Sequence, residues 1–288
     1  MKGRIMVNPG FMIKRTTLWL LGMCLLVSSA WAGELTFAEP RALGERGREF
    51  CVGDFDGDGD PDLGVEKSGY YRYVYQNDGR KSPGYEERLL METDPGPFPD
   101  PMAGRHYAAD FNGDGIDDWL ATGPLTTGVI VKISSGKRPV TFENSIVTIE
   151  YTVYAGAPGE MNGDGKMDVV VLHETENDSE VGITWLHNTG KEEQCYDKLP
   201  VAIVASNELG QGNIHVADLD GDGANDIILD GVWFENDGQP QPGFTKHEFT
   251  GGSAYGFSGR IATADLNGDG HLDVIIGNKY LISDGEKT

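Results

Sequence analysis

The stretch Asp54-Phe-Asp-Gly-Asp-Gly-Asp-Pro-Asp62 is the first of five acidic segments that share one pattern. An acid stands at position 1, Asp or Asn at position 3, Asp at positions 5 and 9, and Gly at positions 4 and 6. We number the segments as loops 1 to 5, at residues 54–62, 110–118, 160–168, 218–226 and 265–273. Carboxylates this close repel one another strongly unless a cation lies between them. The pattern therefore predicts loops that fold around metal ions.

The residue types in these loops match the requirements of calcium. Ca²⁺ takes about six to eight oxygen ligands at roughly 2.3–2.6 Å, and alternate residues of a tight loop can direct carboxylates to one centre. The two glycines allow the positive φ angles that turn the backbone inward. The alternative, acidic loops without a cation, leaves five matched copies unexplained. We therefore expect up to five calcium ions in the protein.

The residues after each loop distinguish it from an EF-hand. An EF-hand needs a bidentate Glu at position 12 and flanking helices. Position 12 is apolar here, and each loop runs into a short β-type segment such as Val169-Val-Val-Leu172 or Ile227-Ile-Leu229. The sequence thus predicts calcium loops on a β scaffold.

The loops recur at intervals that are typical of propeller blades. Their first residues are separated by 56, 50, 58 and 47 positions, and a period near 50 residues with β content indicates a propeller. A hairpin signal ends a later strand of each repeat, for example at Asn77-Asp-Gly79 and Asn236-Asp-Gly238. We expect an all-β fold, a five-bladed β-propeller with four-stranded blades, in one domain at residues 33–288.

The fifth repeat lacks room for its outer strand, because the chain ends at Thr288, three residues after Gly285. An aromatic residue marks the outer strand in the other repeats, and Phe37 stands at a matching distance before loop 1. The sequence predicts that Leu35–Pro40 supplies the missing strand and closes the last blade. Such closure leaves no exposed sheet edge.

The N-terminus has the features of an export signal. Two basic residues precede the apolar run Leu18–Val27, and Ala30-Trp-Ala32 follows it, which is typical of a signal peptide, here residues 1–32, that is removed. The run is too short to cross a bilayer of about 30 Å as a helix. A buried N-terminal helix and a true start at Met12 remain alternatives. The signal predicts a secreted or periplasmic protein without a transmembrane segment in the mature chain.

Composition excludes one class of partner. Acids outnumber bases 46 to 23 among 288 residues, giving a net charge of −23, whereas nucleic-acid binders need Lys and Arg to contact phosphates. The three cysteines are too few for a disulfide scaffold. Cys51 and Cys195 fall on strands of different blades, so we expect no disulfide between them. We expect a monomer.

The loop pattern D-x-[DN]-G-D-G-x-x-D at the start of a β blade resembles the FG-GAP or VCBS-type repeat of integrin alpha-chain propellers and of secreted bacterial and lectin propellers. The resemblance covers essentially the whole mature chain. Two features depart from it, because Glu160 replaces Asp at position 1 of loop 3 and integrin-type propellers usually have more blades.

The resemblance implies calcium ligands at positions 1, 3, 5, 7 and 9, with position 7 acting through its backbone carbonyl. It does not name a substrate. The implied ligands are Asp54, Asp56, Asp58, Asp60, Asp62, Asp110, Asn112, Asp114, Ile116, Asp118, Glu160, Asn162, Asp164, Lys166, Asp168, Asp218, Asp220, Asp222, Ala224, Asp226, Asp265, Asn267, Asp269, His271 and Asp273.

The beginnings of the inner strands supply a second group of candidates, five and three residues before each loop. The polar candidates among these positions are Glu49, Arg105, Tyr107, Asn213, His215 and Arg260. Residues of the same parity share one side of a strand, so we expect them to meet at the mouth of the propeller channel. Such a group suits a uronate or another carboxylated ligand. A hydrated polar channel is the alternative.

Three classes of function remain open. A binding module for carbohydrate or protein ligands is favoured, because binding needs only the scaffold and its loops. The alternative is a polysaccharide-processing enzyme, a lyase or glycosidase, with His215 or Tyr107 as base and Arg105 neutralising a uronate. A purely structural component is the third class. The sequence contains no G-x-S-x-G, H-E-x-x-H or Walker-type motif, and we assign no catalytic residue.

Overall fold

The computed structural model describes residues 49–67, 71–80, 84–92, 105–122, 126–191, 196–206, 212–249 and 260–285, all within the compact unit Gly44–Thr288. The signal peptide and the closing strand Leu35–Pro40 that the sequence predicts lie outside the described residues. Every regular element in the described ranges is a β-strand, and none of their residues forms a helix that could span a membrane. The all-β prediction is confirmed.

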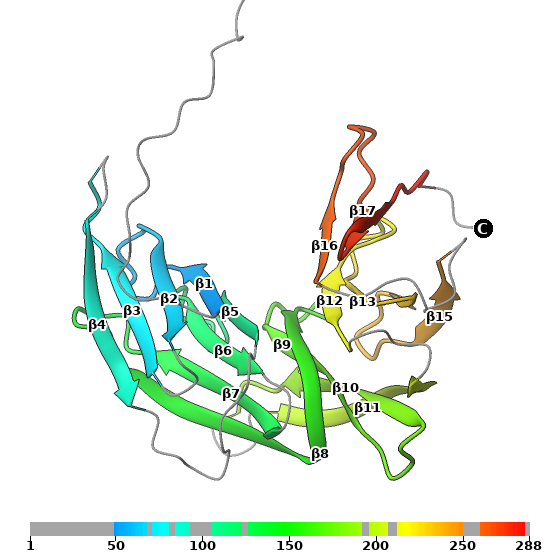
Figure 1. Cartoon of the computed structure of the whole chain (residues 1–288), viewed down its shortest axis with the longest axis horizontal. Helices are drawn as coiled ribbons and strands as arrows, with labels where there is room; N and C mark the ends of the chain where they lie inside the picture. Colours follow the sequence, from blue (N-terminus) through cyan, green and yellow to red (C-terminus); the bar gives the residue numbers. More distant parts are fainter. Residues whose placement is uncertain are drawn as a thin grey trace, which may run out of the picture. The chain divides into compact units, whose positions relative to one another are not determined.

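The strands form four antiparallel sheets in chain order (Figure 1). Their orders are β1-β2-β3-β4, then β11-β10-β9-β8-β7-β6-β5, then β12-β13-β14-β15, then β16-β17-β18. The bounds are β1 Glu49–Gly53, β2 Asp62–Lys67, β3 Tyr71–Asn77, β4 Tyr85–Glu92, β5 Arg105–Ala109, β6 Asp118–Thr122, β7 Thr126–Ser134, β8 Phe142–Gly159, β9 Asp168–Glu174, β10 Glu180–Asn188, β11 Tyr196–Ala205, β12 Ile214–Ala217, β13 Asp226–Leu229, β14 Val232–Asn236, β15 Phe244–Glu248, β16 Ile261–Ala264, β17 Asp273–Ile276 and β18 Lys279–Leu281.

Each acidic loop closes the first hairpin of a structural repeat. The last residue of the inner strand pairs with position 9 of the loop, as Gly53 does with Asp62 and Ala217 with Asp226. We name the units repeats 1 to 5; their inner strands are β1, β5, the second half of β8, β12 and β16. β1 lies against β5, and β12 lies against both β8 and β16 (Figure 1). The closed five-bladed ring stays a prediction.

Repeats 2 and 3 share one uninterrupted strand, which the sequence reasoning missed. The 18-residue β8 pairs with β7 through its first half and with β9 from Val153 to Gly159. The segment between contains β-branched and aromatic residues such as Ile149, Tyr151 and Thr152, with no Gly or Pro. Nothing there favours a turn, so the outer strand of repeat 2 continues as the inner strand of repeat 3.

Position 2 of loops 1 to 3 anchors its repeat to the next one. The Phe55 ring is fully buried, with its centroid 6.0 Å from that of Trp119 and 5.8 Å from that of Phe142 in repeat 2. Phe111 and Met161 are buried in the same way, whereas Leu266 of loop 5 is 47% exposed. The apolar core is therefore built largely between neighbouring repeats.

A polar contact accompanies each apolar anchor in the first three repeats. The side chain that ends the third strand of one repeat donates to the position 2 carbonyl of the repeat before it. Ser134 Oγ donates to Phe55 O at 2.5 Å, Asn188 Nδ2 to Phe111 O at 2.7 Å, and Asn236 Nδ2 to Met161 O at 2.8 Å. These hydrogen bonds fix each loop against the following repeat.

Candidate functional site: the acidic loops and the inner-strand cluster

Position 9 of every loop is a fully buried aspartate that holds the loop to the third strand of its repeat. One oxygen accepts from the position 2 backbone N–H and the other from the backbone N–H that ends the third strand, or in loop 5 from Ser283, two residues after it. For Asp118 the donors are Phe111 N at 2.9 Å and Ser134 N at 2.7 Å. Burial raises the pKa of Asp62, Asp118 and Asp168 to about 6 and that of Asp226 to about 7. The hydrogen bonds of these carboxylates hold each loop in its folded conformation.

Position 1 shapes the turn itself. Its Oδ2 accepts the backbone N–H of the glycine at position 6, from Gly59 to Asp54 at 2.8 Å and from Gly115 to Asp110 at 2.7 Å. These glycines have φ angles of 86° and 84°, which a side chain would strain. In loop 3 the longer Glu160 accepts instead from the backbone of positions 3, 4 and 5. The substitution at position 1 therefore changes the hydrogen bonding of that loop.

The carboxylates of loops 1 and 4 lie close enough together to hold a hard divalent cation. One carboxylate oxygen each from Asp54, Asp56 and Asp62 lies within 4.8 Å of the others, and the same holds for Asp218, Asp220 and Asp222. Asp218 Oδ1 is buried without a hydrogen-bond donor. Carboxylate oxygens are ligands that calcium prefers, and a buried oxygen without a donor is costly unless a cation satisfies it.

Loop 1 contains a cation supplied by the next repeat, which the sequence analysis missed. Arg138 Nε lies 2.6 Å from Asp56 Oδ2, and its Nη2 lies 2.5 Å from both Asp58 Oδ2 and the carbonyl oxygen of Asn77. Gln76 Nε2 also donates to Asp56 at 2.8 Å. The guanidinium thus occupies part of the space that positions 3 and 5 offer a metal.

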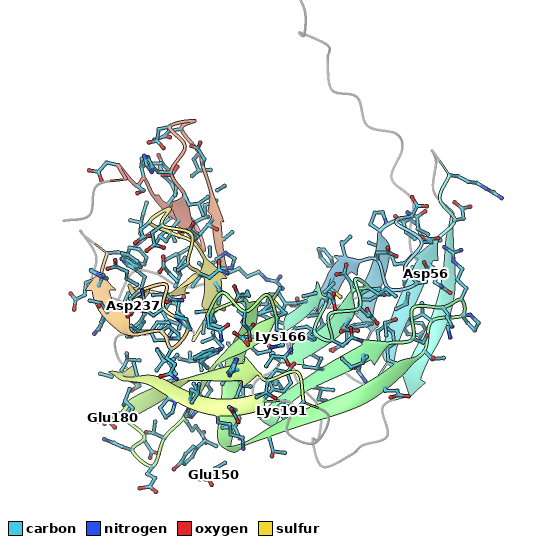
Figure 2. The ribbon with its side chains drawn as sticks, turned by 180° about the vertical axis from the view of Figure 1, so that it is seen from behind. Asp56, Glu150, Lys166, Glu180, Lys191 and Asp237 are labelled. Carbon is cyan, nitrogen blue, oxygen red and sulfur yellow. The ribbon has the colours of Figure 1, made fainter. Side chains whose placement is uncertain are left out.

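Loop 3 also has cationic neighbours. Lys166 Nζ lies 3.1 Å from Asp164 Oδ2, and His187 Nε2 lies 3.4 Å from the same oxygen. Asp56 of loop 1 and Lys166 of loop 3 are labelled in Figure 2. The five loops, matched in sequence, therefore differ in the charges that surround them.

The inner-strand candidates come together from four segments of the chain. Arg105 Nη2 donates to Asn213 Oδ1, and Tyr107 hydrogen-bonds to Arg105. Arg260 Nη2 lies 2.5 Å from both oxygens of Glu49, although 211 positions separate them. We call these residues, with His215, the inner-strand cluster.

Burial and the arginines set the protonation states in this cluster. Burial raises the pKa of the Tyr107 hydroxyl. Burial first, and then the Arg105 charge, lower the pKa of His215 below its ordinary value of 6.5, and its Nε2 lies 3.2 Å from Thr263 Oγ1. Both side chains are therefore uncharged at neutral pH.

Asp230 is a further member that the sequence reasoning missed. It is fully buried, and its carboxylate accepts from the backbone N–H of Asn213 at 3.4 Å and lies 3.5 Å from Asn213 Nδ2. Its position directly after the apolar strand Asp226–Leu229 is a signal that could have identified it. Asp230 orients the amide whose oxygen accepts from Arg105.

The loops and strands agree with comparisons to known proteins. Residues 161–229 match a model described as an FG-GAP-like repeat, and residues 257–286 match the FG-GAP repeat. The chain carries FG-GAP repeats. The FG-GAP matches include all of loops 4 and 5 and most of loop 3, beginning at its second residue. Among curated proteins none shows significant similarity to this chain.

One solved structure supports the same type of fold. An Agrocybe aegerita lectin, from work on specific recognition of non-reducing terminal N-acetylglucosamine, aligns with a TM-score of 0.53 and 21% identity over 77% of this chain. The alignment spans 59% of the lectin. The V. cholerae biofilm matrix protein Bap1 aligns with a TM-score of 0.41 and 15% identity over 79% of this chain and 34% of its own. The described part of the chain is all-β, and its fold is β-propeller-like.

Proposed function

We propose that this FG-GAP protein is a secreted or periplasmic binding module, stabilised by calcium, for carbohydrates that carry a carboxylate. The inner-strand cluster is the binding site. Calcium, when bound, neutralises the loop carboxylates and supplies a rigid link among them. The chain's own residues provide ligand recognition.

The main support for this proposal is that the hydrogen-bond partners of Arg105 are uncharged. Its guanidinium is half-buried and contacts neutral partners, Asn213 and Tyr107. Arg260, by contrast, already pairs with the Glu49 carboxylate. A guanidinium held by neutral groups retains its charge for a ligand, and its planar fork matches a carboxylate in two hydrogen bonds.

The calcium part of the proposal rests on the loops. Positions 1, 3 and 5 present carboxylate or amide oxygens, and the position 9 oxygens retain second lone pairs after accepting backbone N–H groups. Because position 9 is also bonded to the third strand, a metal at the loop stabilises the edge where two repeats meet.

The carbohydrate part of the proposal has support by analogy alone. The lectin that shares the fold recognises a sugar, but similarity at 21% identity concerns the fold, and one fold hosts many functions. The cluster's arginine and uncharged polar groups are what favour a uronate over a neutral sugar.

The enzyme alternative has less support from the geometry. A glycosidase needs two carboxylic acids across the scissile bond, but of the two carboxyl groups of the cluster Glu49 is engaged by Arg260 and Asp230 is fully buried behind Asn213. A lyase needs a base, and the raised pKa of Tyr107 disfavours its phenolate form. Neutral His215 keeps a base in the cluster, so turnover is measured beside binding.

The test is calorimetric titration of the purified protein with soluble oligogalacturonides, with neutral malto-oligosaccharides as the control ligand. We expect binding of the acidic sugar, reduced at least about tenfold by Arg105→Gln, and unchanged by Lys191→Gln at an exposed site. Equal binding of both sugars, or no effect of Arg105→Gln, contradicts the proposal. Release of shortened oligosaccharides would show that the protein is an enzyme.

A further inference from the structure

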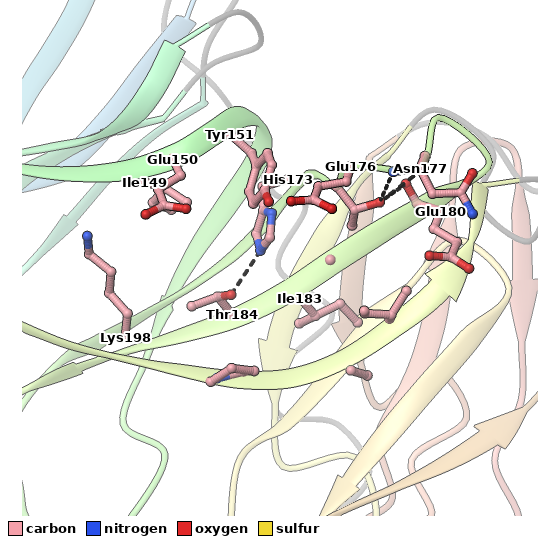
Figure 3. A pocket seen from close by; sticks show the side chains of 15 residues that line it. Ile149, Glu150, Tyr151, His173, Glu176, Asn177, Glu180, Ile183, Thr184 and Lys198 are labelled. Atoms are coloured by element: carbon pink, nitrogen blue, oxygen red, sulfur yellow. Dashed lines mark hydrogen bonds between the residues drawn. The ribbon is translucent and has the colours of Figure 1, made fainter.

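A pocket of about 590 Å³ opens over repeat 3, lined by β8, β9, β10, β11 and the β9–β10 hairpin (Figure 3). It shares no residue with the inner-strand cluster or with the acidic loops. Its exposed apolar surface comes mainly from Ile203, which is 66% exposed, whereas the lining residues Ile149 and Ile183 are buried in the core. An exposed apolar surface inside a pocket favours a ligand with an apolar body.

One wall of the pocket is a fixed aromatic surface. His173 Nδ1 donates to the carbonyl oxygen of Glu174 at 2.6 Å, and its Nε2 lies 2.9 Å from Thr184 Oγ1, so both ring nitrogens are held. A Cβ at Gly182 would collide with this ring, so the glycine makes room for it. Tyr151 stacks on His173 with centroids 5.8 Å apart and planes inclined by 8°.

The charges of the pocket are unequal. Its lining residues include three glutamates and one lysine. Figure 3 shows Glu150 and Lys198 at one end, and Glu176, Glu180 and Asn177 at the other. Lys198 therefore offsets the charge of the first end, while the second end stays acidic beside an apolar surface, where a charge acts more strongly than in water.

The acidic end is rigid because local hydrogen bonds hold the hairpin. Asn177 N donates to Thr175 Oγ1 at 3.1 Å, and Ser179 Oγ donates to Asn177 Oδ1 at 2.7 Å. Glu176 and Glu180 thus border a preformed turn, which reduces the entropy lost when a ligand binds.

We propose that this pocket binds a lysine or arginine side chain of a basic peptide segment. The aliphatic stem packs on Tyr151 and the exposed Ile203, and the cation lies beside Glu176 and Glu180 with the tyrosine ring adding a cation–π contact. β11 is the outermost strand of its sheet, so an extended segment can pair with its backbone. The pocket and the inner-strand cluster then select opposite charges, and the proposal stands independently of the glycan proposal.

The test is fluorescence anisotropy with a labelled decapeptide in which lysine alternates with alanine, added to the purified full chain in calcium. Two matched peptides serve as controls, one with norleucine at each lysine, which keeps the stem and removes the charge, and one with glutamate. We expect the norleucine peptide to bind at least about tenfold more weakly and the glutamate peptide not to bind.

Substitutions inside and outside the pocket test whether the peptide binds there. We expect Glu176→Gln/Glu180→Gln to weaken binding about tenfold and Tyr151→Ala about fivefold. The control Glu143→Gln/Glu248→Gln removes the same charge at two exposed positions outside the pocket and leaves binding unchanged. Thermal unfolding of each variant confirms that it folds.

Three outcomes overturn the proposal. The first is absence of lysine-peptide binding at low salt. The second is equal weakening by the two double variants, because binding then follows the overall charge of −23. The third is tighter binding of a glucosamine oligomer than of the peptide, which assigns the pocket to an amino sugar.

Discussion

Loops 1 and 2 belong to neighbouring repeats and share one backbone pattern, but different groups balance the negative charge of their acidic side chains. Loop 1 has Asp56 at position 3 where loop 2 has Asn112, and the Arg138 guanidinium lies on Asp56 and Asp58. In loop 2 Asn112 Nδ2 donates to Asp114 at 3.0 Å, which partly satisfies that carboxylate from within the loop. Each loop thus balances its acids by a different route.

The difference shows that the motif fixes the backbone but not the charge at the site. Position 9 makes the same two hydrogen bonds in both loops. Counting positions 1, 3 and 5 with Arg138, loop 1 has three carboxylates and one cation, and loop 2 has two carboxylates. The net charge offered to a metal is therefore the same, but in loop 1 the metal must share space with a guanidinium.

Removing calcium should have the largest effect, because it acts on both loops and on the other three. A ligand at about 100 times its Kd stabilises the native state by roughly 2.7 kcal/mol per site. We expect differential scanning calorimetry to show a Tm lower by several degrees in EDTA than in calcium, with magnesium restoring little. An equal Tm in the two buffers would contradict calcium binding to any of the loops.

The Cys51 thiol reports whether the region beneath loop 1 stays closed. It is buried with Trp119 in the core between repeats 1 and 2, and burial raises its pKa from 9.0 to about 12. In a Cys195→Ser background at pH 8, we expect DTNB to react about a thousandfold more slowly than with an exposed thiol. Fast reaction of the native protein in calcium would contradict this burial.

The raised pKa of the Cys51 thiol also predicts how the stability of the protein changes with pH. The unfolded thiol ionises near pH 9, whereas the folded one stays protonated until about pH 12. The unfolded state therefore holds fewer protons between these values, and stability falls as the pH rises above 9. Cys51→Ala should flatten this part of the stability profile measured by urea unfolding.

Position 9 should matter equally in the two loops, even without calcium. Asp62→Ala or Asp118→Ala leaves two buried backbone N–H groups without acceptors, each worth about 1–3 kcal/mol. We expect each variant to lose about 2–4 kcal/mol of unfolding free energy in EDTA, by urea denaturation. The control Asp60→Ala changes a partly exposed position that varies among the loops and should lose far less. A loss in only one loop would mean that the loops fold differently.

Arg138→Gln should change loop 1 alone, with the smallest effect. Because 43% of the Arg138 side chain is exposed, the solvent screens its ion pairs. We expect calcium affinity at loop 1 to rise about threefold to tenfold and stability in EDTA to fall by no more than about 1 kcal/mol. Lys191→Gln is the control. Weaker calcium binding by Arg138→Gln would show that the arginine supports the metal rather than competing with it.

The sequence predicted the parts that depend on short-range pattern. The loops, their glycines, the strands that follow and the positions of Glu49 and Arg260 depend on spacing within one repeat. Arg138, Asp230 and the continuity of β8 were not predicted. Arg138 acts 80 positions from Asp58, Asp230 acts through Asn213, and β8 continues because its sequence lacks a turn signal. Arg138 depends on a contact between repeats, which a periodic pattern does not specify. Asp230 and the continuity of β8 have local sequence signals that a search for repeated motifs does not use.

The unbroken β8 also affects how the chain could be rearranged by evolution or design. Repeat proteins are usually shortened, lengthened or permuted at the connections between repeats. Here the connection between repeats 2 and 3 is itself a strand paired on both sides, so a cut near Tyr151 would remove hydrogen bonds from both repeats. Residues Arg105–Ala205 therefore behave as one indivisible module, and grafts or duplications are better placed outside it.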